Sequence, residues 1–176
     1  MGPKCSKKGV YTATATEDND FQHVDGKGTL SITDRYLKAE YMAMARASNG
    51  MLTRDQFVKL LMFLGYGGEG QAEALVKAVN KDENAVITLD EYYDAMKNNP
   101  EVMQKTSMMR NLFGRFDDNK DGKARRDQIE QGFRDMGVEV DDKMKKDIAK
   151  MDENHDGNVF YQDFVHTQLK NKGYIS

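Results

Sequence analysis

The chain contains one unit twice, and this internal repeat limits what it can fold into more than any other feature. Shifting residues 45–91 by 72 positions lays Gly50 on Gly122, and it lays the Arg-Asp-Gln run at 54–56 on the identical run at 126–128. A repeated segment marks a structural unit that buries its apolar face against a neighbouring unit. The two copies are therefore expected to adopt the same local structure.

Each copy holds two turn-rich clusters of 12 residues whose starts are 35 positions apart, at 45–56, 80–91, 117–128 and 152–163. Apolar residues stand four and one positions before each cluster, and an apolar or aromatic residue follows it, as is typical of flanking amphipathic helices. The preceding pairs are Tyr41/Met44, Val76/Val79, Phe113/Phe116 and Ile148/Met151, and the following residues are Phe57, Tyr92, Ile129 and Phe164. A helix, a loop of 12 residues and a second helix thus recur four times.

This pattern predicts an all-α fold of two helix-loop-helix pairs, with short β pairing between the two loops of each pair. The eighth positions of the loops carry the apolar residues expected on those strands, namely Leu52, Ile87, Ala124 and Val159. We expect a flexible N-terminal tail at residues 1–28, a first pair at 29–98 and a second pair at 99–176. Asn99 suits a helix N-cap and Pro100 a first helical residue, which predicts a break between the pairs and lets them fold back on each other.

The best-formed loop, residues 152–163, matches the donor pattern of a calcium site. Such a loop needs oxygen ligands at positions 1, 3 and 5, a backbone carbonyl at 7, a bidentate carboxylate at 12 and a glycine at 6. The candidate ligands are Asp152, Asn154, Asp156, the carbonyl of Asn158, and Asp163, and Gly157 stands at position 6. The one departure is aspartate at position 12, where glutamate is usual.

The loop at 117–128 begins equally well and ends differently. Its candidate ligands are Asp117, Asn119, Asp121 and the carbonyl of Lys123. Gln128 offers a neutral amide at position 12, where a bidentate anion is expected. Together the two loops resemble the EF-hand pattern over residues 31–170, in the spacing of calmodulin and troponin C. The resemblance implies a calcium-binding protein built from paired EF-hands.

The first two loops resemble EF-hands in spacing more than in ligands. Loop 80–91 has the candidate ligands Asn80, Asp82, Asn84, the carbonyl of Val86, Thr88 and Glu91. Ala85 replaces its turn glycine, and a left-handed conformation there would cost about 1 kcal/mol. Loop 45–56 has no carboxylate at a side-chain ligand position, so we expect an EF-hand in shape that holds no ion.

The aspartate at position 12 of the last loop also bears on which ion binds. Asp163 is one methylene shorter than glutamate and is expected to reach an ion through one oxygen. Magnesium prefers octahedral sites with about six ligands, whereas calcium accepts six to eight. We therefore expect loop 152–163 to accept Mg2+ as well as Ca2+.

Composition excludes several classes of function. The net charge of -3 comes without a cluster of basic residues, so nucleic acid is not an expected partner. A single cysteine, Cys5, permits no internal disulfide and suits a cytoplasmic protein. Gly2 and Cys5 lie in a segment similar to an acylation signal, although Pro3 argues against it, and membrane association is expected only if that terminus is lipidated. The sequence contains no arrangement typical of a catalytic site, so an enzyme is not expected.

Three functions fit these features. A sensor or adaptor would use ion binding to open a methionine-rich groove for an amphipathic helix of a partner protein, and the chain has 12 methionines. A sarcoplasmic-type Ca2+/Mg2+ buffer would hold ions with little opening. A structural subunit resembling myosin light chains would grip its partner without calcium. We favour the sensor or adaptor, while many methionines also fit core positions of helices.

Overall fold

The computed structural model describes residues 31–82 and 84–176. The N-terminal segment 1–28, with Gly2 and Cys5, lies outside the described residues, and so do the predictions made for it. Within the described part of the chain, no helix is both long enough and apolar enough to cross a membrane.

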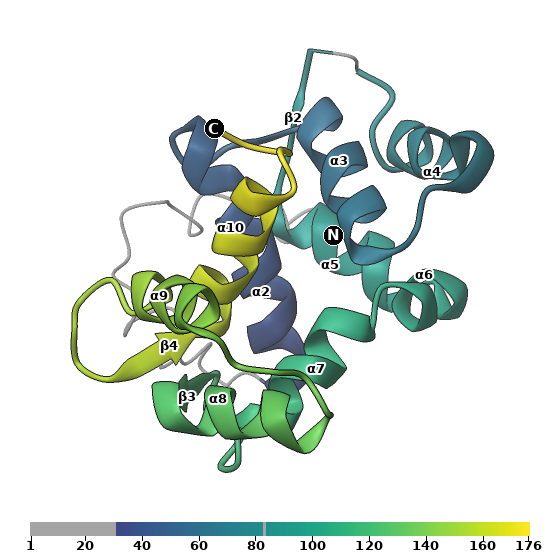
Figure 1. The fold of residues 1–176 in the computed structure, drawn as a ribbon. Helices are drawn as coiled ribbons and strands as arrows, with labels where there is room; N and C mark the ends of the chain where they lie inside the picture. Colours follow the sequence, from purple (N-terminus) through teal and green to yellow (C-terminus); the bar gives the residue numbers. More distant parts are fainter. Residues whose placement is uncertain (1–30, 83) are drawn as a thin grey trace.

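The first half consists of two helix-loop-helix units, shown from purple to teal in Figure 1. Its elements are α2 (Ile32–Ala45), the 3-10 turn η2 (Arg46–Ser48), β1 (Leu52–Thr53), α3 (Arg54–Leu64), η3 (Gly68–Gly70), α4 (Gln71–Val79), β2 (Val86–Ile87) and α5 (Leu89–Lys97). We call residues 45–56 loop 1 and residues 80–91 loop 2.

The second half repeats this arrangement after a short connecting helix. Its elements are α6 (Pro100–Lys105), α7 (Met108–Phe116), β3 (Lys123–Arg125), α8 (Arg126–Asp135), α9 (Asp142–Met151), β4 (Asn158–Phe160) and α10 (Tyr161–Asn171). Residues 117–128 form loop 3 and residues 152–163 form loop 4. The all-α fold with small strand pairs is confirmed.

Local capping explains where the helices begin and end. Ser31 accepts a hydrogen bond from the Asp34 backbone N–H at 3.1 Å and so starts α2. Asn99 caps α6 with Pro100 as its first residue, which confirms the predicted break in the chain. Gly65 ends α3 with a φ of 112°, a value that L side chains rarely adopt.

The two loops of each half are joined by antiparallel strands in the predicted register. Leu52 pairs with Ile87, and Ala124 pairs with Val159. All four of these side chains are buried, so each strand pair also closes the core above its helices. The apolar residue at position 8 of each loop therefore lies on a short strand that joins the two loops of a pair, as the sequence pattern predicted.

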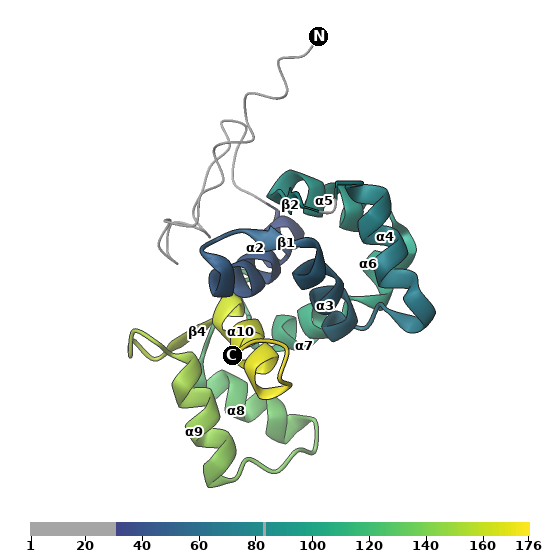
Figure 2. The same cartoon turned by 90° about the horizontal axis from the view of Figure 1, so that it is seen from above.

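The two halves fold back on each other through α2 and α10, which lie side by side in Figures 1 and 2. The rings of Tyr36 on α2 and Tyr161 on α10 have centroids 4.7 Å apart, and both rings are buried. One continuous cluster of buried apolar residues includes members of both halves. The two helix-loop-helix pairs therefore share one core. The boundaries of these pairs, at 29–98 and 99–176, stay a prediction.

A charged residue lies at the centre of the contact between the halves. Glu40 is fully buried and accepts hydrogen bonds at 2.9 Å on both carboxylate oxygens from Arg110 of α7. The hydroxyls of Tyr92 on α5 and Tyr161 on α10 donate to the same carboxylate at 3.0 and 2.7 Å. Four helices from both halves thus meet at one side chain.

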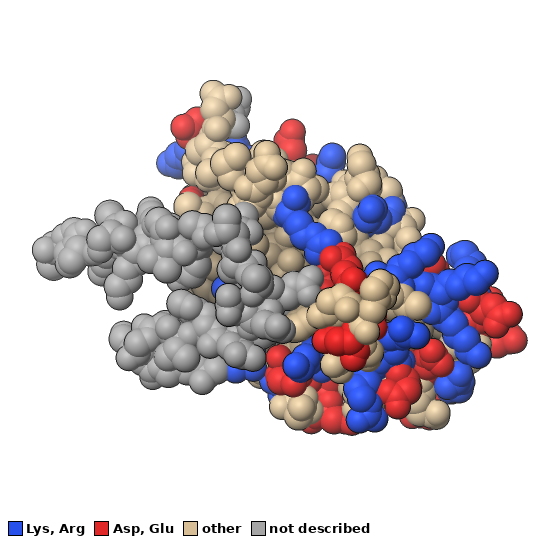
Figure 3. Space-filling model, turned by 90° about the vertical axis from the view of Figure 1, so that its left-hand side faces the viewer, with Lys and Arg blue, Asp and Glu red and all other residues tan. Residues whose placement is uncertain are grey.

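Many of the methionines belong to the core. Met42, Met44, Met96 and Met151 are buried, which confirms that these four methionines occupy core positions of helices. A second set is largely exposed, namely Met51, Met62 and Met108. On the face drawn in Figure 3, Lys and Arg side chains are interspersed with Asp and Glu side chains and do not gather by sign.

Candidate ion-binding site

Loop 4 connects α9 to α10 and is shaped by its first residue. Asp152 is 1% exposed, and its two carboxylate oxygens accept backbone hydrogen bonds from Asp156 at 3.1 Å and Gly157 at 2.9 Å. His155 and Gly157 adopt φ values of 59° and 87°, which turn the chain around that carboxylate. A Cβ on Gly157 would meet nothing within 4 Å, so the position needs glycine for its backbone angle and not for space.

The other end of loop 4 is held by a residue from the first half. Asp163 is 1% exposed, and its Oδ1 accepts a hydrogen bond from Arg46 Nη1 at 2.8 Å. Arg46 Nη2 also donates to Glu153 Oε1, the second residue of loop 4, at 2.5 Å. Arg46 lies in loop 1 directly after α2. Sequence reasoning missed this arginine because 117 residues separate it from Asp163.

The donor atoms of loop 4 have the chemistry that a divalent ion requires, but they are not yet gathered around one point. Asp156 Oδ1 accepts from the Asn158 backbone at 2.8 Å, and Asn154 Nδ2 donates to Asp156 Oδ2 at 3.3 Å. Within the described residues, no three His, Cys, Asp or Glu side chains converge closely enough to hold a metal ion. The residues fit Ca2+ if Asp163 leaves Arg46, and the ligand assignment stays a prediction.

Loop 3 is likewise linked to α2, here at its first position. Asp117 is fully buried, and its Oδ2 accepts hydrogen bonds from the Tyr36 hydroxyl at 2.7 Å and from the Gly122 backbone at 2.9 Å. Burial raises the pKa of Asp117, although the hydrogen bonds from Tyr36, Gly122 and Asp121 act in the opposite direction. The carboxylate is thus already well supplied with donors from the protein.

The last position of loop 3 is engaged within the loop itself. Gln128 Nε2 donates to Asp118 Oδ2 at 2.6 Å, and its Oε1 accepts from the Arg125 backbone at 2.9 Å. A hollow of about 430 Å³ at loop 3 is lined by Gln128 and also by Lys123, Arg125 and Asp121. These two cations add positive charge where an ion would need negative charge.

Loop 2 brings its first and last ligand positions together. Asn80 Nδ2 donates to Glu91 Oε2 at 3.3 Å, while Glu91 Oε1 accepts from the Thr88 hydroxyl at 3.0 Å. Asp82 Oδ1 accepts from the Asn84 backbone at 3.0 Å. Ala85 does not adopt a positive φ. The expectation of a strained left-handed conformation at this residue was therefore wrong. The backbone avoids that conformation because the loop lacks the glycine that would permit it.

Loop 1 keeps the shape of such a loop without its ligands. Asn49 and Gly50 have φ values of 57° and 81°, as the turn requires. Gln56, at position 12, donates its side-chain amide to Ser48 Oγ, and it also completes a capping box with Thr53 at the start of α3. Loop 1 therefore starts a helix and pairs with loop 2.

The chain is similar to several proteins named for calcium binding. A 16 kDa calcium-binding protein of Schistosoma mansoni is 23% identical over 126 residues, which cover 71% of this chain and 87% of that protein. A probable calcium-binding protein of Arabidopsis thaliana, CML29, is 34% identical over 62 residues, covering 35% of this chain and 75% of the relative. The chain belongs to the EF-hand superfamily. No family model matches it.

One further relative of this EF-hand protein is much longer. Calcium-dependent protein kinase 19 of Arabidopsis thaliana is 26% identical over 129 residues, which cover 73% of this chain and 23% of the kinase. The similarity therefore concerns about a quarter of the kinase. The expectation that the EF-hand chain is not an enzyme stays a prediction.

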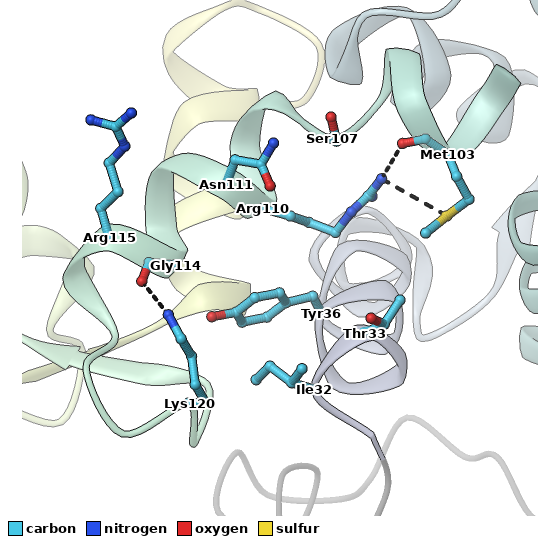
Figure 4. Close-up of a pocket in the computed structure, with 10 residues that line it drawn as sticks. All are labelled: Ile32, Thr33, Tyr36, Met103, Ser107, Arg110, Asn111, Gly114, Arg115 and Lys120. Carbon is cyan, nitrogen blue, oxygen red and sulfur yellow. Dashed lines mark hydrogen bonds between the residues drawn. The ribbon is translucent and has the colours of Figure 1, made fainter. Parts of the chain in front are cut away.

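A cavity of about 490 Å³ lies between α2 and α7 of this EF-hand fold, close to loop 3. Figure 4 shows the ring of Tyr36 across it, with Arg110 directed towards Met103 and Lys120 directed towards the Gly114 carbonyl. The Lys120 ammonium donates to that carbonyl at 2.5 Å, and the Arg110 guanidinium donates to the Met103 carbonyl at 3.1 Å. The side-chain cations of Lys120 and Arg110 are thus both hydrogen-bonded to backbone carbonyl oxygens that line this cavity.

Proposed function

We propose that this EF-hand protein binds calcium at loop 4 and acts as a sensor or adaptor for a partner protein. The observation that carries the proposal is the position of loop 4 at the start of α10, the helix that packs along α2. Asp163 lies in the first turn of α10. An ion that draws Asp163 towards Asp152 therefore acts directly on the helix that joins the two halves.

The calcium assignment is supported by the names of the relatives and by the donor set of loop 4. When bound, the ion would supply a double positive charge that gathers the oxygens of Asp152, Asn154, Asp156, Asn158 and Asp163. The chain's own contribution is the turn at His155 and Gly157, which already aims backbone N–H groups at Asp152. Loop 2, with Glu91 facing Asn80, is the next candidate.

The partner proposed for the sensor is an amphipathic helix of a target protein. Met51, Met62 and Met108 are 51%, 45% and 70% exposed, and thioether side chains adapt readily to different apolar partners. A shift of α10 against α2 would expose further apolar surface from the core that both halves share.

A second candidate is a Ca2+/Mg2+ buffer, and the buried network around Glu40 favours it. Hydrogen bonds from Arg110, Tyr92 and Tyr161 hold four helices to one carboxylate, which resists the opening that a sensor needs. A third candidate is a calcium-independent light-chain-like subunit, which the absence of ligands in loop 1 and the cations Lys123 and Arg125 at loop 3 would suit.

Calcium titration calorimetry combined with fluorescence of an apolar reporter dye tests the proposal. Asp152→Ala should abolish binding at loop 4, while Asn80→Ala should leave that site intact and serves as the control in the other half. For a sensor, dye fluorescence should rise with calcium in the wild-type chain and stay flat in Asp152→Ala. Binding without a dye response would indicate the buffer, and unchanged stoichiometry in Asp152→Ala would show that loop 4 is not the site.

A further inference from the structure

Arg46 is paired with one of the carboxylates that a cation bound at loop 4 would need. Its guanidinium lies 2.8 Å from Asp163 Oδ1, and Asp163 is the position-12 carboxylate of that loop. A second nitrogen of the same guanidinium contacts Glu153 at position 2 of the loop. Arg46 itself stands at position 2 of loop 1, whose side chains offer no carboxylate ligand.

The burial of this contact makes it more than an ordinary surface ion pair. The Asp163 side chain is 2% exposed and the Arg46 side chain 32% exposed. Water therefore has little access to the Asp163 carboxylate if the contact breaks. A buried carboxylate without a partner is costly, and one charged N–H group of Arg46 satisfies Asp163 Oδ1. A divalent ion at loop 4 would also be repelled by a guanidinium held at this distance from one of its ligands.

We propose that Arg46 is an affinity-determining residue for ion binding at loop 4, because it acts as an internal counter-cation that calcium must displace from Asp163. On displacement, Arg46 keeps its contact with Glu153 and swings away from α10. Loop 1 thus contributes to ion binding in the other half of the molecule, although it holds no ligand. The inference rests on the proposed calcium site at loop 4.

The direct test is calcium titration of the full chain carrying Arg46→Gln. Removing the competing cation should tighten calcium binding at loop 4 about tenfold, which corresponds to about 1.4 kcal/mol at 25 °C. Arg126→Gln is the matched control, because it removes the same charge beside the same loop. Arg126 Nη1 lies 3.5 Å from Asp152 Oδ2 on a side chain that is 42% exposed, so its loss should change affinity only about twofold.

Amide hydrogen exchange gives a second measurement that does not depend on affinity. In the wild-type chain, calcium should speed exchange in residues 42–51, where Arg46 loses a partner. In Arg46→Gln the same residues should exchange fast before calcium is added. Arg46→Lys, which keeps the charge without the fork, should fall between the two and serves if the glutamine variant does not fold.

The possible results separate this inference from the proposed function. Equal calcium affinity in wild type and Arg46→Gln, or an equal gain in Arg126→Gln, would overturn the role of Arg46 and leave the calcium site standing. Absence of calcium binding in all of the variants and in the wild type would overturn the proposed function together with the inference. Binding that appears only in Arg46→Gln would support the inference strongly.

Discussion

Arg110 on α7 donates hydrogen bonds of 2.9 Å to both carboxylate oxygens of Glu40 on α2, inside the core and 70 residues away along the chain. Burial raises the pKa of Glu40, and the charge of Arg110 with the tyrosine hydroxyls opposes that rise. A buried pair of this kind costs desolvation energy, and it is stabilising mainly relative to the same site with one partner missing. It links α2 of the first half to α7 of the second.

Removing one member of this pair should destabilise the fold strongly. Glu40→Ala should lower the free energy of unfolding by about 3–5 kcal/mol, because it leaves the Arg110 charge buried without its partner. Urea denaturation followed by circular dichroism measures the change. The double variant Glu40→Met with Arg110→Met should cost much less than the two single changes added together. Strict additivity of the two changes would show that the residues are not coupled.

Two helical glycines should respond in opposite directions to alanine. A Cβ on Gly132 of α8 would overlap the ring of Phe116, which is buried and packed against Phe133 with ring centroids 5.2 Å apart. Gly132→Ala should therefore destabilise by about 1–3 kcal/mol through overpacking.

Gly114 of α7 is the matched control for this change. Its nearest neighbour to an added Cβ is Lys120 Nζ at 3.7 Å, an ordinary contact. Gly114→Ala should be neutral or stabilising by up to about 1 kcal/mol, since alanine favours the helix. Thermal unfolding of both variants decides the comparison, and a stabilised Gly132→Ala would contradict the close packing of Gly132 against Phe116.

The pH dependence of stability should show a contribution from His166. Burial lowers the pKa of this side chain below 6.5, while its hydrogen bond to the Ala43 carbonyl acts in the other direction. The unfolded chain then binds a proton more readily than the folded chain, so stability should be lost as the pH falls through 6.5.

Comparing wild type with His166→Gln isolates this effect. The free energy of unfolding should fall between pH 7.5 and pH 5.5 in the wild-type chain, by more than it falls in the variant. The slope is the informative quantity, because the variant also alters the contact with Ala43. Parallel slopes would mean that His166 titrates alike in both states.

Magnesium should compete with calcium at loop 4. Asp163 is too short to offer both oxygens readily, and a compact site suits magnesium. Calcium titrations repeated in millimolar magnesium should give weaker apparent binding in the wild-type chain. Asp163→Glu should reduce that competition because it restores a bidentate ligand, and Asp82→Glu in loop 2 is the control. Lack of any competition in the wild type would rule out the mixed site.

The sequence alone determined the repeating helix-loop-helix units, and its local signals explain why. The spacing of apolar residues sets which helix face is buried, and Ser31, Asn99 and Gly65 cap helices through contacts within a few residues. The register Leu52 to Ile87 also follows from loop spacing. Glu40 was overlooked, although its place between Tyr36 and Met44 on the apolar stripe was a usable signal.

What only the tertiary structure decided is how the two halves touch and what that contact does to the ion loops. Asp163 could be predicted as a ligand from its place in loop 4, but its partner Arg46 could not. Helical periodicity tells which face of α2 is buried, and it does not tell that α10 covers it. Contacts between residues 117 positions apart depend on the docking of whole helices, and that docking placed a cation beside the carboxylate that calcium would use.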